Sequence, residues 1–349
     1  MTESPSPSPL RGSPPSPKGR GSDEKPSPSG RGLGEGLICW VLTNGMAGFE
    51  TQGIGIAEAL GLTPVMKRVK PSAPWRWIAP RGPAAPNPDI HAPWPDLLIA
   101  SGRQSIPYAR MIRSASKGKT FTVILQNPRV PPSEFDLVWA PAHDRLNGAN
   151  VISTLVSPHR LTVKRLSDEA KRIAPQLDQL PHPRVAVLIG GTNGVYTFDE
   201  AAARQLAEQL ATLADNTGAG LMVTPSRRTG ENQTRILAEA LKDKAAIVWD
   251  GTGENPYFGF LGQADAIIVT CDSVNMVGEA CFTGKPVHVV ELPGKSLKFR
   301  RFLDSIYAAG AARPFVGLLE NWDYAPLDAT HEIAEEIKTR FAKHRDELK

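Results

Sequence analysis

The sequence predicts an α/β protein with two doubly wound domains that face each other across a cleft. From Leu37 onward, short apolar runs alternate with stretches of helical periodicity, a pattern typical of βα units around a mainly parallel sheet. The 349 residues exceed the roughly 250–300 at which one hydrophobic core stops growing, so two domains are expected. Pro181 and Pro183 separate two series of alternating apolar and helical stretches, one for each expected domain. Ligands of such sheets bind beyond the carboxyl ends of the strands, and the cleft is therefore the expected site.

The first domain is predicted over residues 37–180. Its strands are expected at the short apolar runs 37–42, 64–69, 96–100, 121–125, 137–140 and 151–155. Helical periodicity predicts helices at 56–60, 106–116 and 161–180. The glycine-rich stretch 43–55 joins the first strand to the first of these helices, which is the place of a ligand-binding loop.

The second domain is predicted over residues 181–325, and a C-terminal helix over 326–349. Strands are expected at 185–189, 221–224, 246–249, 266–269 and 287–291. Helices are expected at 197–213, 231–241, 256–261, 273–282, 297–309 and 330–343. Thr197 and Glu200 have the spacing of a capping box that opens the first of these helices. Both domains therefore have the element order of a Rossmann-like fold.

Residues 1–36 are predicted to be a disordered, Pro/Ser-rich tail. The first 30 residues contain eight Pro and eight Ser, which cannot build a hydrophobic core. Through Gly36 the segment carries five Arg/Lys and four Asp/Glu, so it lacks the charge of a nucleic-acid-binding arm. A solubilising tail or an artificial extension is the expectation.

Composition narrows the function classes. The three cysteines lie in apolar stretches without CxxC spacing, which predicts a reducing, cytoplasmic compartment. The seven histidines show no metal-ligand spacing, so no metal site is predicted. No apolar run is long enough for a membrane helix, and the net charge of +4 comes without a basic, aromatic-interleaved face for nucleic acid. Trp75 to Trp77 and the basic stretch 295–301 leave two alternatives open, core packing and peripheral contact with an anionic inner-membrane surface.

Two loops at predicted strand ends in the second domain could hold an anion. After strand 185–189 the chain continues through Gly190, Gly191 and Thr192, which either form a tight turn or let backbone N–H groups approach an anion. Strand 221–224 leads to Ser226, Arg227 and Arg228, whose hydroxyl and fork-shaped donors suit phosphate oxygens. An exposed arginine pair in solvent or in salt bridges is the structural alternative.

A third candidate is the start of the predicted helix 273–282. Asp272 and Ser273 are its predicted N-cap, and the free N–H groups of its first turn can bind a phosphate. Asn275 and Glu279 lie off the apolar stripe of this helix. The pattern alone favours a solvated helix residue as the interpretation of Glu279.

The first domain supplies polar residues at the corresponding strand ends. They are Asn44, Gly45, Arg103, Gln126, Asn127, His143 and Asp144. His143 and Asp144 are the best adjacent pair for a general base, which must lie within ~2.6–3.2 Å of the proton it removes. A purely structural His–Asp contact is the alternative.

The second domain resembles the donor half of GT-B glycosyltransferases. The resemblance is carried by residues 249–257, which include Asn255 and Tyr257, and by 260–269, Ser273, 279–280, 284–286 and 289–293. That group includes the peptidoglycan N-acetylglucosaminyltransferase, with UDP-sugar epimerases as structural relatives. The resemblance implies that Ser273 and its helix N-terminus meet a diphosphate, that Glu279 binds the ribose hydroxyls, and that the loop after Trp249 lies against the base.

A more specific resemblance covers residues 37–330. The matching motifs lie at 43–45, 48, 52–53, 99–103, 126–128, 141–144, 190–191, 226–229 and 253–257. They are similar to the ELM-type mitochondrial fission protein family. Its bacterial members are soluble proteins, some of them labelled nucleoside-diphosphate-sugar epimerases, and its plant members act in mitochondrial division through a dynamin-related partner. We expect a bacterial member.

Two functional hypotheses follow. The first is a metal-independent glycosyltransferase-like or epimerase-like enzyme without a cofactor, which uses a nucleotide-diphospho sugar and a glycan or lipid-linked acceptor, with envelope glycan or glycolipid as product. The second is a non-catalytic interaction protein that retains the fold. Asp272 replaces the glycine of many GT-B donor sites and would repel a diphosphate unless Arg227, Arg228 or a cation offsets its charge. The lysines of 294–298 stand where some relatives have a sugar-binding acidic residue and Gln, and favour a more anionic ligand or lipid surface.

Overall fold

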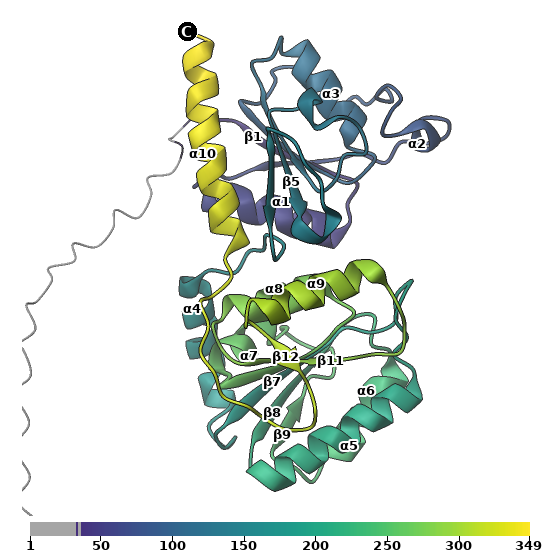
Figure 1. Ribbon diagram of the computed structural model, residues 1–349, viewed down its shortest axis with the longest axis vertical. Coiled ribbons are helices and arrows are strands. Elements are labelled where there is room, and N and C mark those ends of the chain that lie inside the picture. Colours follow the sequence, from purple (N-terminus) through teal and green to yellow (C-terminus); the bar gives the residue numbers. More distant parts are fainter. Residues whose placement is uncertain (1–32, 34–35) are drawn as a thin grey trace, which may run out of the picture. The chain divides into compact units, whose positions relative to one another are not determined.

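The computed structural model describes residues 33 and 36–349. Almost all of the predicted tail therefore lies outside the described residues. Two six-stranded, wholly parallel sheets dominate the structure, each with helices around it (Figure 1). The predicted α/β class with two doubly wound sheets is confirmed. No helix in the described part is long and apolar enough to cross a lipid bilayer.

The first sheet has the strand order β2-β1-β3-β4-β5-β6. Its strands are β1 (Cys39–Thr43), β2 (Val65–Arg68), β3 (Leu97–Ser101), β4 (Phe121–Leu125), β5 (Leu137–Pro141) and β6 (Val151–Thr154). Its connections contain α1 (Ala47–Ala59), α2 (Trp75–Ile78), α3 (Ile106–Ala115) and the 3-10 turns η1 (Pro132–Glu134) and η2 (Ala142–Asp144). Every residue of β1, β3, β4 and β5 is buried, which is why these strands read as continuous apolar runs.

The second sheet has the order β12-β11-β10-β7-β8-β9. Its strands are β7 (Arg184–Ile189), β8 (Gly220–Pro225), β9 (Ala246–Val248), β10 (Ala266–Thr270), β11 (Val287–Val290) and the short β12 (Arg313–Pro314). Its connections contain α5 (Glu200–Thr217), α6 (Glu231–Leu241), α7 (Tyr257–Gln263), α8 (Val274–Phe282) and α9 (Leu297–Ala308).

Each sheet has one point at which the chain reverses its direction of winding. In the first sheet this point lies between β1 and β3, and in the second it lies between β7 and β10. The connections leave opposite faces of the sheet there, so a crevice opens at the carboxyl ends of the two strands. The candidate residues of both predicted domains gather around these ends.

Two helices pack against a different sheet layer from the one that they follow in the sequence. Helix α10 (Ala329–Glu347) follows the second sheet but packs beside α1 (Figure 1) and against β4. There the Phe341 ring meets Phe121 edge to face at 5.7 Å. Helix α4 (Val163–Ile173), continued by η3 (Ala174–Gln176), precedes the second sheet and packs against α7. The chain therefore crosses between the two sheets twice.

Three local expectations differ from the structure. Helix α1 begins at Ala47 rather than at residue 56, so most of the predicted loop is helical. The capping box at Thr197 is wrong: the N-cap of α5 is Asp199, whose Oδ1 accepts the backbone N–H of Ala202 at 2.9 Å. The Thr197 N–H instead donates to the carbonyl of Pro293 at 2.8 Å. Helix α2 and strand β12, two short elements, had no sequence signal.

Candidate functional site

The loops after β7 and β10 meet at the carboxylate of Asp272. One carboxylate oxygen accepts the backbone N–H of Gly191 at 3.0 Å, and the other accepts the Thr270 hydroxyl at 2.6 Å. The side chain of Asp272 has no exposed surface. Gly191 has φ 138°, and a Cβ there would lie 2.1 Å from the carbonyl oxygen of Arg228, so the close approach of the loops requires glycine. A buried carboxylate thus fills the crevice at the reversal point of the second sheet.

Arg228 supplies the countercharge. Its Nη2 lies 2.9 Å from the nearer Asp272 carboxylate oxygen, and its Nη1 donates to the carbonyl of Gly191 at 3.3 Å. Its backbone N–H donates to Ser226 Oγ at 3.1 Å, and the Ser226 hydroxyl in turn donates to the carbonyl of Gly190. Ser226 and Arg228 therefore stabilise the loops after β7 and β8 through these hydrogen bonds. Arg227 beside them is exposed and forms no ion pair with any described residue.

Helix α8 begins at the same crevice. Its N-cap is Ser273 alone, whose Oγ accepts the N–H of Met276 at 3.4 Å. The Asn275 amide oxygen accepts from Gln52 of α1 at 3.5 Å, and Gln52 accepts from Gln126 after β4 at 3.3 Å. This chain of three amides connects helix α1 and the loop after β4, from the first sheet, with helix α8 of the second.

Glu279, one helical turn further, forms a pair with Tyr257. The Tyr257 hydroxyl donates to the Glu279 carboxylate at 2.6 Å. Burial raises the pKa of Glu279 to about 7, and the Tyr257 hydrogen bond only partly opposes this shift. Both side chains keep some exposed surface. The pair is therefore a hydrogen-bonding group that changes charge near neutral pH.

A pocket of about 500 Å³ lies at the carboxyl ends of β8 and β9. The loop after β8 contributes Ser226 and Arg227, helix α6 contributes Arg235, and the loop after β9 contributes Trp249 and Asp250. Glu231 also lines it, so the pocket combines an indole ring and two guanidinium groups with two carboxylates. An aromatic ring can stack on an indole, and an attached anion can bind guanidinium groups.

The predicted catalytic pair does not form a hydrogen bond. His143 Nε2 lies 3.8 Å from the Asp144 carboxylate, whereas Lys298 Nζ of α9 lies 2.8 Å from it. The His143 ring is buried and meets Phe302 edge to face at 5.7 Å. Burial, with a smaller contribution from Lys298, lowers the pKa of His143, so the imidazole is neutral at neutral pH. The role of His143 as a base stays a prediction.

Four further candidates hold local turns with their side chains. In each case an oxygen of the side chain accepts a nearby backbone N–H, at 2.9–3.2 Å. These four are Asn44, Asn127, Thr192 and Asn255. Gly45, next to Asn44, has φ 85°, which the turn after β1 requires. The presence of these polar residues after the strands is therefore explained by the turns that they stabilise.

A second pocket, of about 420 Å³, lies at the carboxyl ends of the first sheet. Of the candidates, it brings together Arg103, Gln126, Asn127 and Asp144. Arg129 and Lys298 also line it. The sequence analysis missed Arg129 and Thr270, because neither belongs to a motif and only the folded loops place them.

A sequence model described as Mitochondrial fission ELM1 matches residues 47–341. The chain belongs to the mitochondrial fission ELM1 family. It is 31% identical over 275 residues to the "Mitochondrial fission protein ELM1" of Arabidopsis thaliana, a match that covers 71% of this chain and 64% of that protein. It is 27% identical over 285 residues to the "Uncharacterized protein RP120" of Rickettsia prowazekii (strain Madrid E), covering 70% and 79%. The chain thus spans slightly less than two thirds of the plant member of its family.

Among solved structures, the fold of this ELM1-family chain is similar to a putative UDP-N-acetylglucosamine 2-epimerase from Listeria monocytogenes. The TM-score is 0.51 at 10% sequence identity, over 88% of this chain and 91% of that one. The GT-B-like architecture expected from the donor-half resemblance is therefore confirmed as a fold.

Proposed function

We propose that this ELM1-family protein binds a nucleoside-diphosphate sugar along the carboxyl edge of its second sheet, as a glycosyltransferase-like protein. The observation that supports this most is the course of the loop after β9. It begins at Trp249, which lines a pocket with Arg227, and it leads to Tyr257, whose hydroxyl donates to Glu279. The Listeria protein of similar fold is described as a putative UDP-N-acetylglucosamine 2-epimerase.

In this proposal each part of the ligand has a partner of matching chemistry. The base stacks on Trp249, and the ribose hydroxyls bind the Glu279 carboxylate. The diphosphate lies outside Asp272, between Arg227 and the first-turn N–H groups of α8. The acceptor would be a glycan or lipid-linked molecule on the first sheet, and envelope glycan or glycolipid the product. A soluble, cytoplasmic protein with peripheral contact to the inner membrane would meet such an acceptor.

A second candidate function is a non-catalytic interaction protein. Two observations favour it. The Asp272 carboxylate already accepts the Gly191 N–H that a phosphate oxygen would take, and His143 lies 3.8 Å from Asp144 rather than within hydrogen-bond distance. The plant relative is named for mitochondrial fission and not for a reaction on a sugar.

A thermal-shift screen distinguishes a nucleotide-sugar-binding protein from a non-catalytic interaction protein. The purified protein is heated with UDP, GDP, CDP, ADP and TDP and with their sugars, beside an Arg227→Ala variant and an Arg204→Ala control. Arg227 makes no described ion pair, so its loss should leave the fold intact. Arg204 is an exposed arginine of α5 that does not line the pocket. A ligand at ~100 times its Kd adds about 2.7 kcal/mol to the free energy of unfolding.

The proposal expects a base-selective rise in Tm that falls in Arg227→Ala and persists in Arg204→Ala. No rise with any nucleotide would favour the interaction protein, and capture of a partner would then be the next experiment.

A further inference from the structure

Three adjoining cavities form a continuous track on the first half of the chain. The pocket of about 420 Å³ at the strand ends shares Arg103 and Arg129 with a cavity of about 760 Å³. That middle cavity shares Arg81 and Gly82 with a third, of about 660 Å³. A ligand that occupies the track would thus extend from the carboxyl edge of β3 and β4 to the outer face of α3.

The middle cavity of the track carries a strong positive charge. Arg81, Arg103 and Arg129 all line the middle cavity, no acidic residue lines it, and none of the three arginines forms an ion pair with a described residue. Arg103 donates one bond, to the carbonyl of Arg76 at 2.5 Å, and keeps its remaining donors. Asp144, the one carboxylate in the strand-end pocket, is already paired with Lys298. The uncompensated charge favours an anionic group, and guanidinium donors suit phosphate oxygens.

The loop that carries Arg129 has an uncommon backbone. Arg129 has φ 58°, and Gln126 at the other end of the same loop has φ 77°, so both residues lie in the left-handed region that disfavours side chains with a Cβ. Such backbone strain clusters at ligand-binding sites, where the surrounding structure holds it in place. Here it places the Arg129 guanidinium on the cavity that Arg103 also lines.

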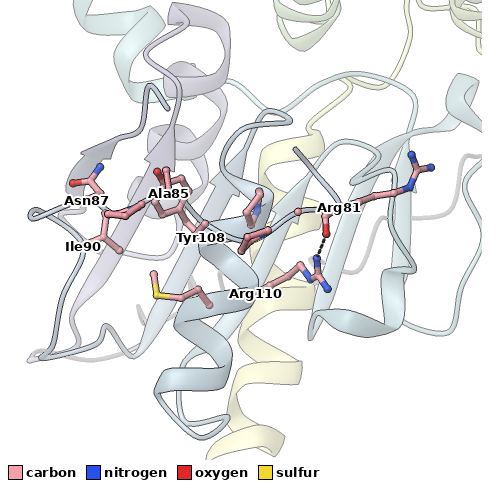
Figure 2. Close-up of a pocket in the computed structure, with 12 residues that line it drawn as sticks. Arg81, Ala85, Asn87, Ile90, Tyr108 and Arg110 are labelled. Atoms are coloured by element: carbon pink, nitrogen blue, oxygen red, sulfur yellow. Dashed lines mark hydrogen bonds between the residues drawn. The ribbon is translucent and has the colours of Figure 1, made fainter. Parts of the chain in front are cut away.

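The outer end of the track is apolar. Trp77 and Ile78 of α2 line the middle cavity with 67% and 43% of their surface exposed, so two adjacent apolar side chains are open to a ligand there. The third cavity is lined mainly by proline, alanine, Ile90, Tyr108 and Met111. Figure 2 shows that Arg110 points to the backbone carbonyl of Arg81, to which it donates at 3.1 Å, while the Arg81 side chain extends away from the labelled apolar residues.

We propose that this track binds the phosphate monoester of a long-chain alcohol. The phosphate lies between Arg103 and Arg129, and the hydrocarbon chain passes Trp77 and Ile78 into the cavity beside α3. The assignment of this ligand as the acceptor rests on the proposed function, but its binding does not require a nucleotide.

Calorimetry with the full chain tests the proposal, with dodecyl phosphate below its micelle concentration as the probe. Dodecanol and inorganic phosphate each supply one half of the ligand and are expected to bind at least tenfold more weakly. Arg129→Gln and Arg103→Gln each remove charge-assisted hydrogen bonds worth about 1.5–3 kcal/mol, so binding should weaken ~10–100-fold. Arg204→Gln, on exposed α5, is the matched control and should bind as the wild type does.

Three outcomes would overturn the proposal. Equal binding of dodecanol would show that the arginines do not recognise the phosphate. Unchanged binding in both arginine variants would place the ligand elsewhere. Binding to phosphatidylglycerol vesicles without binding of the monomeric phosphate would indicate a membrane surface rather than a cavity. UDP added in a parallel titration keeps the two sites distinguishable, because its binding depends on Arg227 and not on Arg129.

Discussion

The Asp272 carboxylate accepts a hydrogen bond from the backbone N–H of Gly191, at 3.0 Å. Backbone N–H groups at the reversal point of a doubly wound sheet are the usual partners of a phosphate oxygen. The protein's own side chain takes this position, and Arg228 compensates its charge. An incoming diphosphate therefore meets a negative charge rather than a free donor.

Asp272→Asn is expected to strengthen binding of nucleoside diphosphates by about tenfold or more. The amide keeps the size of the side chain and removes a repulsion worth about 1–4 kcal/mol at ~4 Å. Calorimetry with UDP and GDP measures the change. Asp304→Asn on exposed α9 is the control, and unchanged affinity in Asp272→Asn would mean that the diphosphate does not approach this crevice.

Removal of Arg228 is expected to cost more stability than removal of its partner's charge. Arg228→Ala leaves a fully buried carboxylate without its cation, whereas Asp272→Asn leaves a cation that is 39% exposed and can be hydrated. We expect a loss of about 1–3 kcal/mol for Arg228→Ala and less for Asp272→Asn. The double variant should be more stable than the sum of the two losses predicts, and urea unfolding of all four proteins measures the difference. Strict additivity would contradict the coupling.

The sequence carries most of the fold but only part of this site. Strands such as β3 and β4 are buried on both faces, so their apolar runs are visible without a structure. The glycines of residues 43–55 indicated a loop, so the sequence did not reveal that α1 already begins at Ala47. Asp272 contacts Gly191 and Arg228 through loops that lie far apart in the chain, so the sequence did not reveal that this carboxylate is paired within the fold.

Glu279 makes stability depend on pH in a defined direction. Its pKa is raised from 4.5 to about 7 in the folded protein, so the folded state binds the proton more tightly than the unfolded state does. The free energy of unfolding should therefore fall as pH rises from about 4.5 through 7, because the unfolded chain ionises first. Glu279→Gln removes this dependence.

The Tm of wild type relative to Glu279→Gln, measured from pH 5 to pH 8, is the readout. Tyr257→Phe should move the transition to higher pH, since the Tyr257 hydrogen bond lowers the pKa of Glu279. A difference in Tm that does not change with pH would refute a raised pKa.

Two glycines on one helix should respond in opposite ways. A Cβ at Gly55 would lie 2.2 Å from the backbone carbonyl of His159, which cannot move as a side chain can. Gly55→Ala should therefore destabilise the protein by about 1–3 kcal/mol or more. A Cβ at Gly48 meets only the Asn275 amide at 3.4 Å, so Gly48→Ala should be neutral or stabilise by up to about 1 kcal/mol. Chemical unfolding compares the two, and equal effects would contradict this packing.

Phe341 should be among the most sensitive positions of the last helix. It is 3% exposed and meets Phe121 of β4 edge to face. Phe341→Ala should cost about 3–5 kcal/mol, whereas Lys343→Ala on the exposed side of α10 should cost less than about 0.5 kcal/mol. Thermal unfolding separates the two variants. Similar small losses would show that α10 is only loosely attached.

The pairing of Phe121 with Phe341 also sets the order of events during synthesis. The first sheet is synthesised before the second, whereas α10, the helix that packs on its strand β4, is synthesised after the second sheet. At ~5–20 residues per second, on the order of ten seconds or more pass before that cover is made. For this time the nascent first sheet exposes apolar surface to the surrounding solution. Folding in the cell is therefore expected to need a chaperone at this stage. A chain truncated before the 19-residue helix α10 is expected to aggregate instead of folding.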